Sequence, residues 1–355
     1  MKRRPRMQGF SMVEMMVAIT IGLLLLVALV GTMVAGRKDY STNAGQGELQ
    51  NAGATISNLI AQSARGAGFF ACSGSSTSNE LLTAGSLLGN FSNPVIGYGA
   101  VVASSSLALS SLNGSNDGAL SDWSPALDSS LQGLVAKGSD VLVLSGQANG
   151  AVPVWVSAYA SAGATSLQTQ SSSTIAVNNV LAVSNCANST IVQVSGVNSA
   201  SGVVTVSLAQ ALDSNYPAGS MAAPLAQTAY FVGQATGSQS ALYQAYYDGT
   251  TTNWKTTPLV PGVDTMQVWY GIGGASGAVN EYVPAGQVSN WSQVYALRVA
   301  LLLEGPLGSA PASPNTGSCV NQRQWTVLGN TVTVPCDTRL RHVYTMTVSL
   351  RNAGL

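Results

Sequence analysis

The feature that most constrains this chain is a long apolar run near its start. Residues 15–36 contain no charged residue and no proline. As a helix this run would be about 33 Å long, and the hydrocarbon core of a bilayer is about 30 Å thick. We therefore predict a membrane-spanning helix over residues 10–36.

The residues around the run predict its orientation and its processing. Four basic residues precede it, which favours a cytoplasmic N-terminus even though Arg37 and Lys38 follow it. A secretory signal has a shorter apolar core with its cleavage site behind it. Here the candidate cleavage point, Gly9–Phe10, lies before the run. Cleavage there would remove a basic leader, residues 1–9, and leave the helix on the mature protein.

Glu14 is the one carboxylate at the edge of this apolar segment. A charge near the bilayer centre costs about 2.5–3.5 kcal/mol on insertion scales, whereas the dipole of a helix N-terminus returns only about 0.3–1 kcal/mol. A cationic amine from another subunit would offset the difference, because opposite charges attract strongly at low dielectric. The alternative is a simple anchor with a stray carboxylate.

The segment from Gly9 to Glu14 reads GFSMVE and is followed by the apolar run. It resembles the class III signal of type IV prepilins and of type II secretion pseudopilins. The resemblance implies that a prepilin peptidase cuts after Gly9 and that the new N-terminal Phe10 is methylated. It also implies that Glu14 neutralises the N-terminal amine of a neighbouring subunit during filament assembly.

The composition is poor in charge, with 8% charged and 46% hydrophobic residues. Removing the four basic residues of the leader from fourteen leaves ten basic side chains against fourteen acidic ones, so the mature side chains sum to about −4. No basic stripe is left to follow a phosphate backbone, which disfavours direct binding of nucleic acid. The neutral polar composition is typical of an exported or assembled protein.

Four cysteines all lie after the membrane segment, and an even number on the exported side predicts two disulfides. Three pairings are possible. We favour Cys319–Cys336, whose loop of about 18 residues would contribute about 3 kcal/mol in the chain-entropy model. Cys72–Cys186 then follows by elimination. We predict no metal site and no cofactor, because the chain has no Cys-x-x-Cys motif and a single histidine, His342.

The rest of the chain predicts an α+β fold. An amphipathic stem helix over 37–68 continues the membrane helix, and its glycines each weaken it by about 1 kcal/mol relative to Ala, so packing must support it. A Ser/Ala/Gly-rich β lobe follows over 69–220, with a hairpin expected over 190–208 and Ser-rich loops at 103–132 and 161–174. A β region follows over 221–355, with a strand pair expected at 229–249, alternating strands at 263–271 and 343–350, and a central strand at 294–303. The expected architecture is a long pilin stem helix packed on a large, mainly antiparallel β head.

The second half carries a further resemblance. The segments 258–271, 295–303 and 345–352, and the step FFAC at 69–72, look like the PilW minor pilins. This resemblance implies a minor pilin that joins or primes a type IV pilus near its tip and supports twitching motility or adhesion. Implied partners are the prepilin peptidase, other minor pilins, the major pilin, a PilY-type tip adhesin and the inner-membrane assembly platform. The implied location is the inner membrane before assembly and the pilus at the cell surface afterwards.

An enzyme would need a catalytic constellation, and the sequence offers little. His342 stands alone, and no phosphate-binding loop occurs. Asp264 and Glu281 are a possible carboxylate pair, but both lie in turn-like contexts that favour capping or solvated roles. We predict no catalysis. Two alternatives to the minor pilin remain. One is a J-like pseudopilin of type II secretion, which has a related second half. The other is a pilin-anchored adhesin or carbohydrate-binding module, for which tryptophans such as Trp254 and Trp291 could line a surface.

Overall fold

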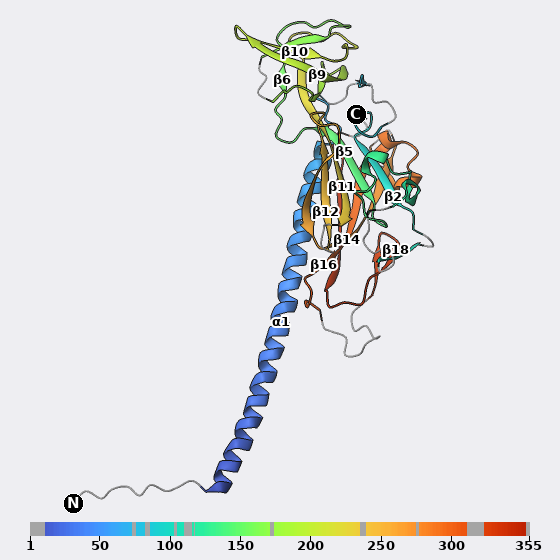
Figure 1. Cartoon of the computed structure of the whole chain (residues 1–355). Coiled ribbons are helices and arrows are strands. Elements are labelled where there is room, and N and C mark those ends of the chain that lie inside the picture. The colour runs from blue at the N-terminus through green and yellow to red at the C-terminus, as the bar shows by residue number, and fades with distance from the viewer. Residues whose placement is uncertain are drawn as a thin grey trace, which may run out of the picture.

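The computed structural model describes residues 11–72, 76–81, 86–102, 105–109, 116, 118–170, 174–234, 239–274, 277–310 and 323–352. Its main feature is one helix, α1 (Met12–Gly66), of 55 residues, whose second half lies along a β-rich head (Figure 1). The predicted α+β class and the stem-and-head architecture are confirmed.

Helix α1 changes its environment along its length without a break. Its residues are exposed from the N-terminal end to Tyr40, one position before the first contact with the head. There the Ser41 hydroxyl donates to the Gly308 carbonyl at 2.7 Å. Beyond this point Leu49, Ile56 and Ile60 are buried at helical spacing. Among the described residues α1 is the one helix long and apolar enough to cross a membrane.

Two glycines of α1 lie where the head approaches it most closely. A Cβ atom on Gly45 would lie 2.6 Å from the Cβ of Ser309, and one on Gly53 would lie 2.5 Å from the ring of Tyr344. Both distances are too short for real atoms, so these positions have space only for glycine. A Cβ atom on Gly47, in contrast, would meet nothing within 4 Å.

Among the described residues, the larger sheet has twelve strands. Its main path is β4 (Trp123–Ser124), β2 (Val95–Ala100), β5 (Val141–Gln147), β11 (Met221–Gln234), β8 (Val180–Ser184), β9 (Asn188–Ala200), β10 (Val203–Leu208) and β7 (Ser166–Thr169). Four strands pair off this path: β1 (Ser76–Asn79) with β9, β6 (Val154–Trp155) and β12 (Ser240–Tyr247) with β11, and β13 (Lys255–Pro261) with β12. Strand β11 pairs with β5, β6, β8 and β12, and so connects the upper strands to the lower ones (Figure 1).

The described part of the head contains two smaller sheets. The first is antiparallel, in the order β15 (Val279–Pro284), β14 (Val263–Gly273), β16 (Val294–Glu304) and β19 (Arg341–Ser349). The second contains β17 (Gln324–Val327), β18 (Asn330–Thr333) and β3 (Ser106–Ala108). Short 3-10 helices lie at η2 (Leu120–Asp122), η3 (Ser129–Leu131), η4 (Ala285–Gln287) and η5 (Trp291–Gln293).

One hydrophobic core joins the helix to both of the larger sheets. It combines Ile56 and Ile60 of α1 with Leu142 of β5 and with Leu297 and Val299 of β16. A separate core, which includes Leu167, Val192 and Val206, fills the upper end of the head. The stem is therefore part of the folded head and is held by its main core.

Several local predictions are confirmed. The expected hairpin at 190–208 is β9–β10, the pair expected at 229–249 is β11–β12, and β16 is an inner strand between β14 and β19. The predicted loops at 103–132 and 161–174 are wrong, because these segments contain strands β3, β4 and β7. In β7 the buried Leu167 and Thr169 alternate with exposed residues, a pattern too short to distinguish from a Ser-rich loop by sequence.

Candidate assembly site

The helix α1 begins with a reciprocal cap. The backbone N–H of Val13 donates to the Ser11 hydroxyl, and the backbone N–H of Ser11 donates to the Glu14 carboxylate, each at 3.3 Å. This arrangement is a capping box, which satisfies donors that a helix N-terminus leaves unpaired. The signal was present in the sequence as Ser-x-x-Glu before an apolar run, but Ser11 was not predicted as a functional residue.

Glu14 is exposed, and no basic side chain among the described residues pairs with it. The contact with Ser11 uses one carboxylate oxygen, Oε2. Gly9 and Phe10, the predicted cleavage and methylation residues, lie outside the described residues. The structure therefore places Glu14 in the first turn of α1 and does not test its expected pairing with a neighbouring subunit.

Large apolar side chains surround Glu14 and continue along the exposed half of α1. Met12 is 87% exposed, Leu24 is 72% exposed and Leu29 is 69% exposed. Such a surface needs a cover of lipid or of other helices, because soluble monomers rarely expose large contiguous apolar patches. When lipid or other helices cover this surface, the Glu14 carboxylate loses its contact with water together with the apolar side chains. The desolvation cost of its charge then applies.

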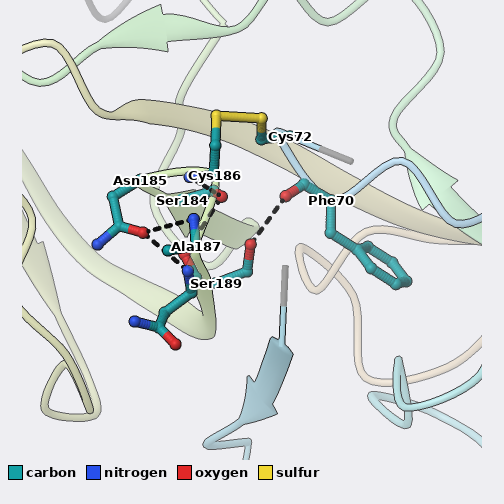
Figure 2. The surroundings of a disulfide bond; sticks show 8 residues. Phe70, Cys72, Ser184, Asn185, Cys186, Ala187 and Ser189 are labelled. Carbon is teal, nitrogen blue, oxygen red and sulfur yellow. Dashed lines mark hydrogen bonds between the residues drawn. A yellow bond between two sulfur atoms is a disulfide. The ribbon is translucent and has the colours of Figure 1, made fainter. Parts of the chain in front are cut away.

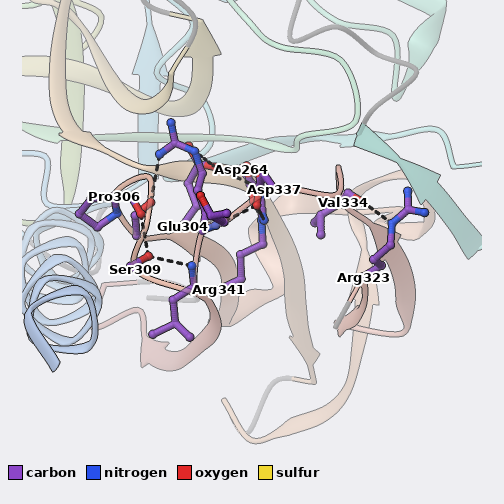
Figure 3. A network of polar contacts seen from close by, with 12 residues as sticks. Asp264, Glu304, Pro306, Ser309, Arg323, Val334, Asp337 and Arg341 are labelled. Atoms are coloured by element: carbon purple, nitrogen blue, oxygen red, sulfur yellow. Dashed lines mark hydrogen bonds and ion pairs between the residues drawn. The ribbon is translucent and has the colours of Figure 1, made fainter. Parts of the chain in front are cut away.

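A buried ionic network lies where the stem meets the lower edge of the head (Figure 3). Arg341, with its side chain 4% exposed, pairs with Asp264 at 2.7 Å, Glu304 at 3.2 Å and Asp337 at 2.7 Å. Arg339 approaches Glu304 at 3.7 Å. These residues connect three segments, the start of β14, the end of β16 and the start of β19.

The electrostatics of this network follow from its burial. Burial raises the pKa of Glu304 to about 7, and the Asp264 carboxylate beside it acts in the same direction. Burial also raises the pKa of Asp264, although Arg341 opposes the shift. The interpretation of Asp264 as a capping or solvated group is wrong, because it faces Arg341 inside the head. Glu281, its possible partner in the sequence, lies exposed on β15.

The disulfide Cys72–Cys186 is present, with 5.2 Å between the Cα atoms (Figure 2). It joins the segment just after α1 to the turn between β8 and β9. Within that turn, the side-chain oxygen of Asn185 accepts from the backbone N–H groups of Ala187 and Asn188, at 2.9 and 2.7 Å. The predicted Cys319–Cys336 pairing stays a prediction, because Cys319 lies outside the described residues.

Two of the aromatic residues that could have lined a glycan surface pack against the cores of the head, Trp254 buried and Trp291 partly buried. Trp254 is 9% exposed and its indole N–H donates to the Ser130 hydroxyl at 2.9 Å. Trp291 packs edge-on against Tyr270, with ring centroids 4.9 Å apart. His342 is exposed on β19. Within the described ranges, no group of three or more His, Cys, Asp or Glu side chains is placed to hold a metal ion.

The half-exposed apolar stem, the capped carboxylate in its first turn and the β head agree with the architecture expected of a pilin. Comparison with family models supports this class at both ends of the chain. Residues 229–352 match the model of the type IV pilus-assembly protein W, and residues 4–30 match the prokaryotic N-terminal methylation motif. The predicted recognition is confirmed: the chain combines the region of the PilW type IV pilus assembly family with the methylation motif.

Among solved structures, the chain is similar to a type IV-like pilin from Thermus thermophilus. The two are 22% identical over 37% of this chain and 70% of that one, with a TM-score of 0.26. This TM-score is too low to support a conclusion on fold or function. No curated protein matched the chain.

Proposed function

We propose that this chain is a minor pilin that joins or primes a type IV pilus, near the tip of the filament. The observation that carries the proposal is the exposed, capped Glu14 at the start of an exposed apolar helix. The same chain carries a C-terminal PilW region. Before assembly, the stem would anchor the protein in the inner membrane with its N-terminus in the cytoplasm and its head in the periplasm.

In this proposal the prepilin peptidase cuts after Gly9, and the amine of Phe10 is methylated. Glu14 then pairs with the N-terminal amine of a neighbouring subunit. The energetics favour this pairing, because a buried carboxylate without a cation is costly and the exposed stem must be covered in any case. The other partners would be further minor pilins, the major pilin, a PilY-type tip adhesin and the assembly platform.

A position near the tip is compatible with the size of the head. The head follows a stem of 55 helical residues and makes up most of a chain of 355 residues. Such a head would crowd a shaft built of small subunits, whereas the tip has free space around it. Support for twitching motility or for adhesion would follow from the role in building the pilus.

Deletion of the gene tests the role in assembly. We expect fewer surface pili and reduced twitching, with unchanged levels of major pilin in the cell and recovery on complementation. Unchanged pilus number and twitching would contradict the proposal. Secreted proteins should be measured in the same strain, because loss of secretion with intact pili would identify a type II pseudopilin instead.

A further inference from the structure

The four-stranded sheet has two faces that differ in what covers them. Its inner face, with Val268, Leu297 and Val299, packs on helix α1. At one end of the outer face, Ala300 and Leu302 are covered by the three-stranded sheet. The other end of this outer face is partly exposed, and the turn between β17 and β18 borders it at Gly329, beside Trp269.

The partly exposed end of this outer face carries two rows of side chains across the strands. In the first row, Trp269 of β14 lies directly opposite Arg298 of β16, which lies opposite Thr347 of β19. In the second row, Tyr282 of β15 lies opposite Gly271 of β14. Trp269, Tyr282 and Arg298 are partly exposed and Thr347 is exposed.

Gly271 lets the ring of Tyr282 lie across β14 toward Arg298. A Cβ atom at position 271 would lie 3.0 Å from the Tyr282 ring and 3.2 Å from the Cβ of Ala296. The ring centroid of Tyr282 lies 4.0 Å from the guanidinium carbon of Arg298, a cation–π distance. The ring of Tyr282 therefore holds the arginine on a partly exposed surface.

Within the described residues, the Arg298 guanidinium has neither a carboxylate partner nor a hydrogen-bond acceptor. The buried guanidinium of Arg341, in contrast, binds three carboxylates of the head. Glu281 cannot serve Arg298, because it precedes Tyr282 on the same strand and its side chain points to the opposite face. The donors of Arg298 remain open to a group from outside.

We propose that Trp269, Tyr282, Arg298 and Thr347 form a docking surface for a carboxylate side chain of another protein subunit. A guanidinium binds a carboxylate through two parallel N–H donors, and stacking on an aromatic ring pre-organises it. Tryptophan, tyrosine and arginine are also the residues that most often dominate protein interfaces. The identity of the partner as another pilus subunit rests on the proposed function.

Site-specific photocrosslinking in the full-length protein tests this surface. Benzoylphenylalanine replaces Thr347, next to Arg298, in cells that produce the whole pilus system. We expect a covalent adduct with a second protein, and mass spectrometry of the adduct should locate an Asp or Glu within a few residues of the crosslinked position. Arg298→Glu should lower the adduct yield by roughly tenfold, the effect of about 1.4 kcal/mol.

Lys255→Glu is the matched control, because it reverses an exposed charge on β13 outside this surface. Its adduct yield should stay unchanged. Formation of the Cys72–Cys186 disulfide and protein level report folding of each variant. If Arg298→Glu does not accumulate, Arg298→Gln takes its place. Replacing the mapped carboxylate by Arg should restore the adduct in the Arg298→Glu background.

Three results would overturn the proposal: no protein adduct or only a polysaccharide adduct, an adduct insensitive to Arg298, or a mapped site without a carboxylate. Each result concerns only this surface. Normal pili with no adduct would leave the role in pilus assembly standing, since gene deletion tests that role separately.

Discussion

Asp140 shows how a single buried carboxylate connects the sheets of the head. It is 4% exposed and has no cationic partner among the described residues. Its two oxygens accept from the backbone N–H groups of Ala100 and Val268, at 2.8 and 2.7 Å. These bonds connect the ends of β2 and β5 to the middle of β14. Burial raises the pKa of Asp140 to about 7 in spite of both bonds.

This pKa predicts a pH dependence of stability. Because the pKa is about 7 in the folded state and 3.8 as the unperturbed value, the folded state binds more protons than the unfolded state between about pH 4 and 7. The free energy of unfolding should therefore be highest at the acid end and fall toward pH 7, by at most about 1.4 kcal/mol per pH unit for this group. Glu304, with a pKa near 7, adds a fall of the same sign.

The measurement is denaturant unfolding of the full chain in detergent at several pH values. Asp140→Asn should be less stable than the parent, because its amide nitrogen cannot accept a hydrogen bond, and its pH-dependent fall should be smaller. Asp39→Asn, at an exposed position of α1, should keep the parent slope. An Asp140→Asn slope equal to that of the parent would contradict this assignment.

At the level of single residues, the sequence was sufficient to predict roles that depend on the spacing of nearby residues. Glu14 was identifiable because Gly9, Glu14 and the apolar run lie in one continuous segment of the sequence. The role of Asp264 was not, because its partner Arg341 lies 77 positions away and the preceding Pro-Gly step indicates a turn. Burial of Asp264 results from long-range strand pairing, which residue types alone do not specify.

At the level of elements, α1 shows glycines in two physical roles. Helix propensity treats every glycine as a weak point. Gly45 and Gly53, however, lie against Ser309 and Tyr344, where a side chain would collide with the head. A Cβ atom on Gly47 or Gly36 would meet nothing within 4 Å. The same helix therefore contains glycines that packing requires and glycines that only weaken it.

This difference predicts opposite effects for two neighbouring substitutions. Gly53→Ala should lower the free energy of unfolding by about 1–3 kcal/mol, because overpacking against the Tyr344 ring outweighs the gain in helix propensity. Gly47→Ala should raise it by up to about 1 kcal/mol. Denaturant unfolding in detergent measures both. Equal effects of the two substitutions would show that the packing of α1 on β19 differs from this account.

At the level of the whole molecule, the class of fold was predictable and the order of the strands was not. Alternating segments in the second half correctly indicated β14, β16 and β19. The twelve-stranded sheet places β5 beside β11 and β11 beside β8, so neighbours in space are far apart in sequence. The Cys72–Cys186 disulfide closes a separation of 114 residues between the end of the stem and the upper strands.

The second half of helix α1 packs on the head, and its first half is exposed (Figure 1). The exposed half carries Glu14, so the head needs no contact with this carboxylate to fold. A substitution of Glu14 should accordingly separate assembly from folding and from membrane insertion. The assembly mechanism depends on this separation.

The most direct test is the amount of a Glu14→Gln variant in sheared pili, relative to its amount in the membrane. We expect normal insertion, cleavage after Gly9 and formation of the Cys72–Cys186 disulfide, with incorporation reduced roughly tenfold or more, the effect of about 1.4 kcal/mol or greater. Glu48→Gln, at an exposed position of the same helix, should be incorporated normally. Incorporation of Glu14→Gln at the parent level would contradict the claim that this carboxylate pairs with a neighbouring subunit.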